Sequence, residues 1–282
     1  MIGACQYAQT PSIPELAELR RICESPHACS QPQALILKTG LGLDADLPGR
    51  GLPFGRVHEW LGLLPPSTEA PSQHKPTRNN TWSPPLSLLI QLAHAALGEA
   101  ENTQSRIVWI ARPGATGCSL RPYPPALGAG SPDGAPRRRD LIASSLFVSA
   151  SSPSQRLWAT DLALRSRAAI AVIADASGFD LGATRRLQLA AEASGVLCLI
   201  TRPAHEQSVL SASTTRWLVR TCPSSTSARR WTVSLLRCKG VQPAPGAPRL
   251  WTLERDHATR AFAVVPHLRD RSHQAQTLRL TG

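Results

Sequence analysis

The sequence lacks several features that would mark a membrane, secreted or metal-binding protein. None of its apolar runs approaches the roughly 20 residues that span a bilayer, and its first residues do not place a basic stretch before an apolar one. Its seven cysteines form no C-x-x-C pair and have no zinc-like spacing with histidine. We therefore expect a soluble, cytoplasmic protein with reduced thiols, no metal site and no cofactor.

Lysine is also scarce, so arginine carries nearly all of the positive charge. The chain has only Lys38, Lys75 and Lys239, yet its formal net charge is +12. Such an excess favours polyanionic partners, either nucleic acid or an acidic protein surface. Arginine suits phosphate recognition, but an arginine-rich composition also follows from a GC-rich genome. The charge alone therefore leaves nucleic-acid binding open.

What the sequence does contain is the alternation of helices and strands that is typical of an α/β domain. Helical periodicity predicts helices over 86–97, 154–167 and 183–194. Short, almost wholly apolar runs predict strands over 56–61, 107–110, 145–149, 168–174 and 196–201. Strands that are apolar on both faces indicate a parallel sheet that is covered on both sides.

Later in the chain the pattern changes to that of antiparallel strands. Hydrophobic residues around Trp217, Trp231, Trp251 and Phe262 alternate with polar ones, which is the period of half-buried strands. The tryptophans could stack on nucleic-acid bases, but their strand periodicity favours core packing. The predicted fold class is therefore α/β, with three layers and a mainly parallel central sheet that C-terminal antiparallel strands extend.

Three kinds of segment fall outside these elements. An N-terminal helical segment, 1–34, contains an amphipathic helix over 12–23 that either packs on the core or docks on a partner. A polar, basic tail is expected to be flexible. Proline-rich loops interrupt the core, and the first of them is either disordered or a partner surface. The core is predicted at 35–265, its loops at 63–85 and 111–140, and the tail at 266–282.

Residues 39–62, TGLGLDADLPGRGLPFGRVHEWLG, resemble the stretch that leads into the nucleotide site of RecA-type recombinases. The run LALRSRAAIAVIADAS resembles the strand of that superfamily that ends on a magnesium-side aspartate, here Asp175. Within the superfamily the chain resembles the ImuA family, through RRLQLAAEASGV, RWTVSLLRCKG and WTLERDHATRAF. The resemblance covers residues 35–265 and implies a RecA-like fold.

The resemblance also implies a function. ImuA is the RecA-like accessory protein of bacterial mutagenesis cassettes, so the implied role is in damage-induced, error-prone translesion DNA synthesis within the SOS response. The implied partners are an ImuB-like polymerase-related protein, an error-prone DNA polymerase III alpha subunit, and RecA. Single-stranded DNA is a further candidate partner.

The nucleotide site of a RecA-type ATPase is incomplete in this sequence. A phosphate-binding loop needs G-x-x-x-x-G-K-[ST], because its glycines let backbone N–H groups wrap the phosphates while the lysine and hydroxyl reach the terminal phosphates and magnesium. Only the first glycine, Gly62, is present, and no acid between Glu101 and Asp133 could orient an attacking water. We expect Gly62 and Asp175 to mark a vestigial site in a protein without catalytic residues or enzymatic activity.

Clusters of arginine provide the candidate DNA contacts. The favoured ones lie in the second loop, after the last parallel strand and in the tail: Arg137, Arg138, Arg139, Arg202, Arg269 and Arg271. Further pairs are found at 185–186, which lies on a predicted helix, and at 229–230. The alternative interpretation of every cluster is a solvated surface.

Two other functions fit the same superfamily. A SulA-like cell-division inhibitor would bind the tubulin-like division protein, whereas an ATP-dependent recombinase would exchange DNA strands. The missing phosphate loop and glutamate disfavour the recombinase. A non-catalytic accessory protein that links a translesion polymerase complex to RecA and DNA is the favoured interpretation.

Overall fold

Strands with apolar residues on both faces build the centre of the protein. In the computed structural model, strand β6 (Ala169–Asp175) is buried along its whole length. Ala171 and Ile173 pack into the hydrophobic core on one side of the sheet, and Val172 and Ala174 pack into the core on the other side. This alternation confirms a sheet that is covered on both faces.

The structure describes residues 35–64, 82–113, 140–224, 228–239, 250–256 and 261–265. The segments predicted at 1–34 and 266–282 lie outside the described residues, as do most of the loops predicted at 63–85 and 111–140. The predicted helix over 12–23 and the basic tail therefore remain predictions.

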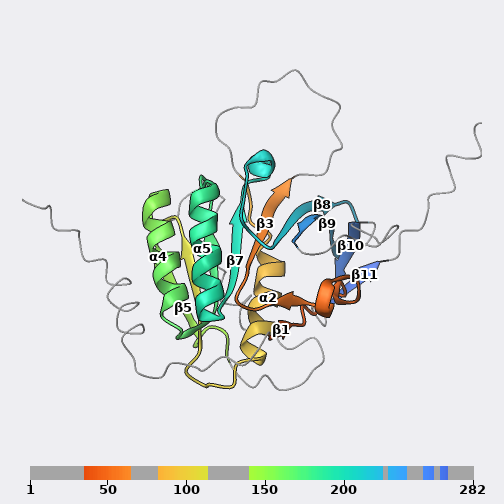
Figure 1. The fold of residues 1–282 in the computed structure, drawn as a ribbon. Helices are drawn as coiled ribbons and strands as arrows, with labels where there is room; N and C mark the ends of the chain where they lie inside the picture. Colours follow the sequence, from red (N-terminus) through yellow and green to blue (C-terminus); the bar gives the residue numbers. More distant parts are fainter. Residues whose placement is uncertain are drawn as a thin grey trace, which may run out of the picture.

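One nine-stranded sheet organises the described part of the chain, in the order β11-β10-β9-β8-β3-β7-β6-β4-β5 (Figure 1). The strands from β5 to β8 pair in parallel, and β8 to β11 pair antiparallel. Besides β6, the strands are β3 (Val57–Leu64), β4 (Arg106–Ala111), β5 (Ser145–Ser149), β7 (Leu197–Arg202), β8 (Thr215–Cys222), β9 (Arg229–Cys238), β10 (Leu250–Arg255) and β11 (Phe262–Val265). The predicted mixed sheet is confirmed.

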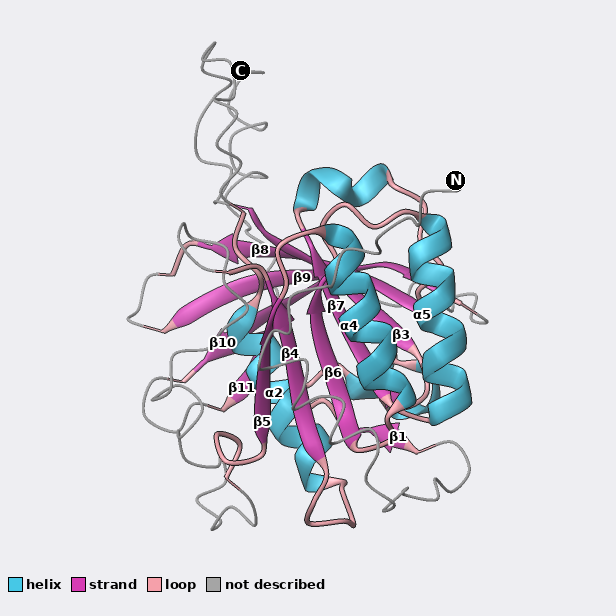
Figure 2. Cartoon of the chain, turned by 90° about the vertical axis from the view of Figure 1, so that its left-hand side faces the viewer, coloured by secondary structure: helices cyan, strands magenta, loops and turns pink. Residues whose placement is uncertain are grey.

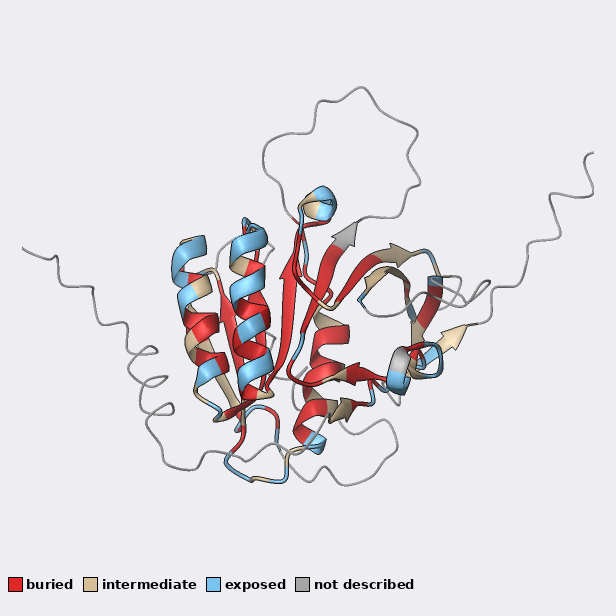
Figure 3. Ribbon diagram, in the orientation of Figure 1, coloured by how far each residue is buried: buried red, intermediate tan, exposed pale blue. Residues whose placement is uncertain are grey.

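Helices cover both faces of the sheet. Helix α2 (Leu86–Gly98) packs into the core on one face, whereas α4 (Pro153–Arg165) and α5 (Leu181–Ser194) pack on the other (Figures 1 and 2). Their buried sides face the sheet and their exposed sides face solvent (Figure 3). The three-layer α/β architecture is thus confirmed. Within the described ranges, no helix has both the length and the apolar character needed to cross a bilayer.

The chain reverses its direction across the sheet. It runs from β3 through α2 to β4 and β5, then returns through α4, β6, α5 and β7 toward β8. A short 3-10 helix, η3 (Ala204–Ser208), lies between β7 and β8. Because the parallel strands end at one edge, the carboxyl ends of β3, β4, β6 and β7 meet there. Open α/β sheets bind ligands at such an edge, near the reversal of strand order.

The tryptophans of the last strands belong to the core. The Trp60 and Trp217 rings stack with centroids 5.2 Å apart, and Trp251 lies 5.9 Å from Trp217. Trp217, Trp231 and Trp251 are all buried. Their predicted packing role is confirmed. Strand β8 nevertheless differs from the expected pattern, because it pairs in parallel with β3 and antiparallel with β9.

A smaller unit precedes β3 and carries the stretch that resembles recombinases. It contains β1 (Ile36–Leu37), β2 (Leu52–Pro53), and the 3-10 turns η1 (Asp44–Asp46) and η2 (Pro48–Arg50). The Asp44 carboxylate accepts hydrogen bonds from the backbone N–H of Thr39, at 3.0 and 3.1 Å, and from its hydroxyl at 2.8 Å. Gly51 is required here, because a Cβ at this position would overlap the Leu37 carbonyl. These contacts fix the approach to β3.

Candidate functional site

Gly62 lies where the resemblance places the start of a phosphate-binding loop. Strand β3 does not end there but continues to Leu64. Trp82 is buried, and a Cβ on Gly62 would overlap its ring and lie 2.6 Å from the carbonyl oxygen of Ser83. Residues 82 and 83 therefore pack directly against the backbone of Gly62. The space beside this glycine is filled by the chain itself.

The N-terminus of α2 is shaped by two prolines. Pro84 and Pro85 precede the helix and contribute no N–H groups. In the first turn, the amide of Leu86 donates to the Pro84 carbonyl at 2.7 Å, and the amide of Leu88 donates to the Pro85 carbonyl at 3.0 Å. A helix N-terminus binds phosphate through free amides. Here most of those donors are missing or already engaged.

Asp175 ends strand β6 and is buried at the same edge of the sheet. Its carboxylate accepts hydrogen bonds from Arg112 Nε at 2.7 Å and from the backbone N–H and hydroxyl of Ser177, at 2.9 and 2.5 Å. The Ser177 contacts are those of an Asx-type turn that caps the loop leading to α5. Asp175 therefore caps the loop that follows β6.

Arg156 of α4 donates hydrogen bonds to the loop between β6 and α5. Its buried guanidinium donates to the backbone carbonyls of Asp175, Ser151 and Ser177, at 2.8 to 2.9 Å. Burial lowers the pKa of Arg156, and the nearby Asp175 carboxylate opposes that effect. Even with this shift an arginine stays protonated. Arg156 therefore acts as a fixed donor that closes the β6–α5 loop.

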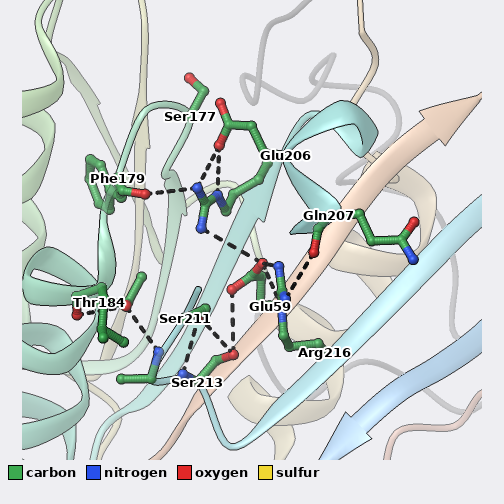
Figure 4. Close-up of polar contacts among 12 residues, drawn as sticks. Glu59, Ser177, Phe179, Thr184, Glu206, Gln207, Ser211, Ser213 and Arg216 are labelled. Carbon is green, nitrogen blue, oxygen red and sulfur yellow. Dashed lines mark hydrogen bonds and ion pairs between the residues drawn. The ribbon is translucent and has the colours of Figure 1, made fainter. Parts of the chain in front are cut away.

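A second polar cluster joins β3, β7 and β8 (Figure 4). Glu59 of β3 and Arg216 of β8 are register partners, and two guanidinium nitrogens of Arg216 donate to one Glu59 oxygen at 2.7 and 3.0 Å. Arg202 of β7 places Nη1 3.9 Å from the same oxygen. Glu59 is fully buried. A buried carboxylate requires such partners, because leaving it unpaired costs several kcal/mol, on the order of 3–5.

Glu206 of η3 connects this cluster to the β6–α5 loop. Its carboxylate accepts from Arg202 Nε at 2.7 Å and from the backbone N–H of Gly178 at 3.0 Å. Arg202 also donates to the carbonyl of Phe179 at 2.7 Å, and Arg216 donates to the carbonyl of Gln207 at 3.1 Å (Figure 4). The connection between β7 and β8 is therefore held down over the edge of the sheet.

Of the six predicted DNA contacts, the structure describes only Arg202. Arg202 is fully buried and engaged by Glu206, so a phosphate could reach it only if the cluster opened. Two arginines of the pairs at 185–186 and 229–230 form ion pairs: Arg186 binds Asp161 at 2.8 Å, and Arg230 binds Glu254. The other predicted contacts, Arg137, Arg138, Arg139, Arg269 and Arg271, lie outside the described residues.

Sequence reasoning missed Trp82, Arg156, Glu206 and Arg216. One signal was available for Arg216: a glutamate inside an apolar strand must find a cation, because a lone buried charge is unstable. The pairing strand was not identifiable from local pattern. Across the parts of the chain that the structure covers, no three His, Cys, Asp or Glu side chains gather closely enough to hold a metal ion.

Comparison with known proteins gives two relatives that cover most of the chain. Each is a Protein ImuA from Caulobacter vibrioides, one from strain NA1000 / CB15N and one from strain ATCC 19089 / CIP 103742 / CB 15. Each is 28% identical to this chain over 244 residues, which are 81% of the chain and 87% of the relative. No family model matches the chain. The similarity shows homology to ImuA.

The packing at Gly62 predicts a steric cost for any side chain. We expect Gly62→Ala to lower the free energy of unfolding by about 1–3 kcal/mol, because the new Cβ must displace Trp82 or the backbone of Ser83. Gly98→Ala, at the end of α2, is the matched control, since a Cβ there meets no neighbour within 4 Å. Denaturant unfolding measures both. Equal stabilities of the two variants would show that residues 82–83 do not pack on Gly62.

Loss of the Glu59–Arg216 ion pair should lower the free energy of unfolding more than Gly62→Ala does. Arg216→Met should cost about 3–5 kcal/mol of unfolding free energy because it leaves the buried Glu59 carboxylate without its main partner. The double variant Glu59→Leu/Arg216→Met should recover much of this loss.

Arg230→Met is the matched control for that measurement. Its partner Glu254 is partly exposed, so the variant should cost about 1 kcal/mol or less. A loss for Arg216→Met no greater than that of Arg230→Met would contradict the role assigned to Glu59.

Proposed function

Because the chain is homologous to ImuA, we propose that it is a non-catalytic accessory protein of damage-induced, error-prone DNA synthesis. The observation that carries this proposal is the similarity over 244 residues, which spans most of both chains. Homology of this extent suggests a role in the ImuA/ImuB mutagenesis cassette.

In this proposal the protein binds several partner molecules and catalyses no reaction. Its partners are an ImuB-like polymerase-related protein, an error-prone DNA polymerase III alpha subunit, RecA and single-stranded DNA. The excess of arginine supports contact with acidic partners or with DNA. Among the predicted DNA contacts, Arg137, Arg138, Arg139, Arg269 and Arg271 remain candidates.

The edge of the sheet supports a protein that does not turn over ATP. Phosphoryl transfer requires a phosphate cradle, a bound magnesium ion and an oriented water. Trp82 packs on Gly62, and prolines start α2, where a cradle would need free amides. The Asp175 carboxylate is engaged by Arg112 and Ser177. In the described part of the chain, Gly62 and Asp175 thus already contact other residues of the protein.

Co-purification tests the proposed role. The full-length chain, carrying a removable affinity tag, is mixed with purified ImuB-like protein or RecA, each with and without single-stranded DNA. We expect the ImuB-like protein to be retained in the absence of DNA and RecA to be retained on DNA. An unrelated protein with a similar net positive charge controls for electrostatic capture. If the chain retains neither partner, the proposed function is wrong.

A further inference from the structure

The solvent side of α5 carries large apolar residues. Leu181 and Leu189 are 44% and 57% exposed, and they lie eight positions apart on one side of the helix with Arg185 between them. Leu210, from the connection between β7 and β8, is 70% exposed. Apolar side chains that gather on a surface mark an interaction site more often than isolated ones do.

Leu210 lies on a segment that packs beside α5. Two residues after it, the backbone N–H of Ala212 donates to the Thr184 hydroxyl of α5 at 3.0 Å. Lys239, which follows β9, donates from its ammonium group to the carbonyl of Ala212 at 2.5 Å. We call the surface formed by Leu181, Arg185, Leu189, Leu210 and Lys239 the α5 surface.

The charge of the α5 surface is positive and only partly compensated. Burial lowers the pKa of Lys239, and the positive charges of Arg237, Arg56 and Arg185 lower it further. Glu192 is the one acid that opposes this effect on Lys239, and its carboxylate already pairs with Arg56.

The other acids beside α5 also have partners within the chain, and one of them, Asp161 of α4, pairs with Arg186 and Arg165. Asp180 caps the N-terminus of α5 by accepting from the Ala183 amide, and Glu206 pairs with Arg202. No acid beside α5 is therefore left to neutralise Arg185 and Lys239 in the described part of the chain.

We infer that the α5 surface binds an acidic segment of a partner protein that also presents aliphatic side chains. Glutamates or aspartates of the segment would pair with Arg185 and Lys239, and its aliphatic side chains would cover Leu181, Leu189 and Leu210. This inference rests on the proposed accessory role, because it gives that role a surface and defines the chemistry of the partner.

The leucines favour a protein segment over the other occupants. Aliphatic side chains gain nothing from phosphates and do not stack on bases as aromatic ones do, so a purely nucleic-acid surface would leave them exposed. A second copy of the chain is disfavoured by charge, because the sequence has 31 basic residues against 19 acidic ones. An acidic, aliphatic segment complements both features of the surface.

A direct binding measurement tests this surface with the full-length chain alone. The probe is a fluorescent synthetic peptide with leucines at helical spacing and glutamates between them, followed by fluorescence anisotropy. The comparison ligands are the same peptide with serines in place of leucines, the peptide with lysines in place of glutamates, and single-stranded oligothymidine. We expect the acidic leucine peptide to bind. The affinity for each altered peptide should be lower by a factor of about ten or more.

A surface variant and a matched control locate the binding. Arg185→Glu/Leu189→Ser should weaken peptide binding by about tenfold or more. Arg229→Glu/Leu250→Ser, which changes an exposed arginine and a 45% exposed leucine on the antiparallel strands, should leave it within about twofold. Circular dichroism verifies that both variants are folded.

Several outcomes would overturn the inference. The first is that the wild-type chain binds no peptide, and the second is that the surface variant and the control variant bind the peptide equally well. The third is that the wild-type chain binds only oligothymidine and loses that binding in the surface variant. The fourth is that the wild-type chain forms a dimer that the surface variant disrupts and the control variant does not. Because this measurement uses no partner protein, its failure is separate from failure of the co-purification. A chain that binds the peptide but retains neither partner would contradict only the proposed function.

Discussion

The buried ion pair between Glu59 and Arg216 is the centre of a polar network near the carboxyl edge of the sheet. Glu59 is fully buried on β3, between β7 and β8, so its charge must be matched from those strands. Arg216 supplies the direct partner, and Arg202 supplies a second cation that is itself held by Glu206. Glu206 also accepts from Gly178, which links the β6–α5 loop to the same network. Glu59 and Glu206 together thus connect three strands, a 3-10 helix and a loop.

Contacts within the chain occupy the carboxyl edge of the sheet in its described part. Near the strand ends, Trp82 packs on Gly62 and the Ser177 amide donates to Asp175. Accessible apolar side chains are found on α5, at Leu181 and Leu189, and beside it at Leu210. This is the surface for which we propose an acidic partner segment.

Much of the fold was predictable from sequence because it depends on local pattern. Strand β5 lies at the predicted 145–149, and the periodicity of Trp217, Trp231 and Trp251 predicted their burial. Contacts between distant residues were not predictable. Arg202 follows an apolar run and was expected to meet DNA, but η3 folds back and engages it through Glu206. Likewise, β3 extends past the expected loop start at 63 to Leu64, and no local signal placed Trp82 against Gly62.

Equilibrium binding of ATP with magnesium tests most directly whether the edge of the sheet is closed. The full-length chain is titrated with a fluorescent ATP analogue, with and without single-stranded DNA, and ATP turnover is measured in the same preparations. Asp175→Ala is the reference variant. The account predicts no saturable binding and turnover equal to that of the variant. Saturable binding, or turnover that Asp175→Ala abolishes, would contradict it.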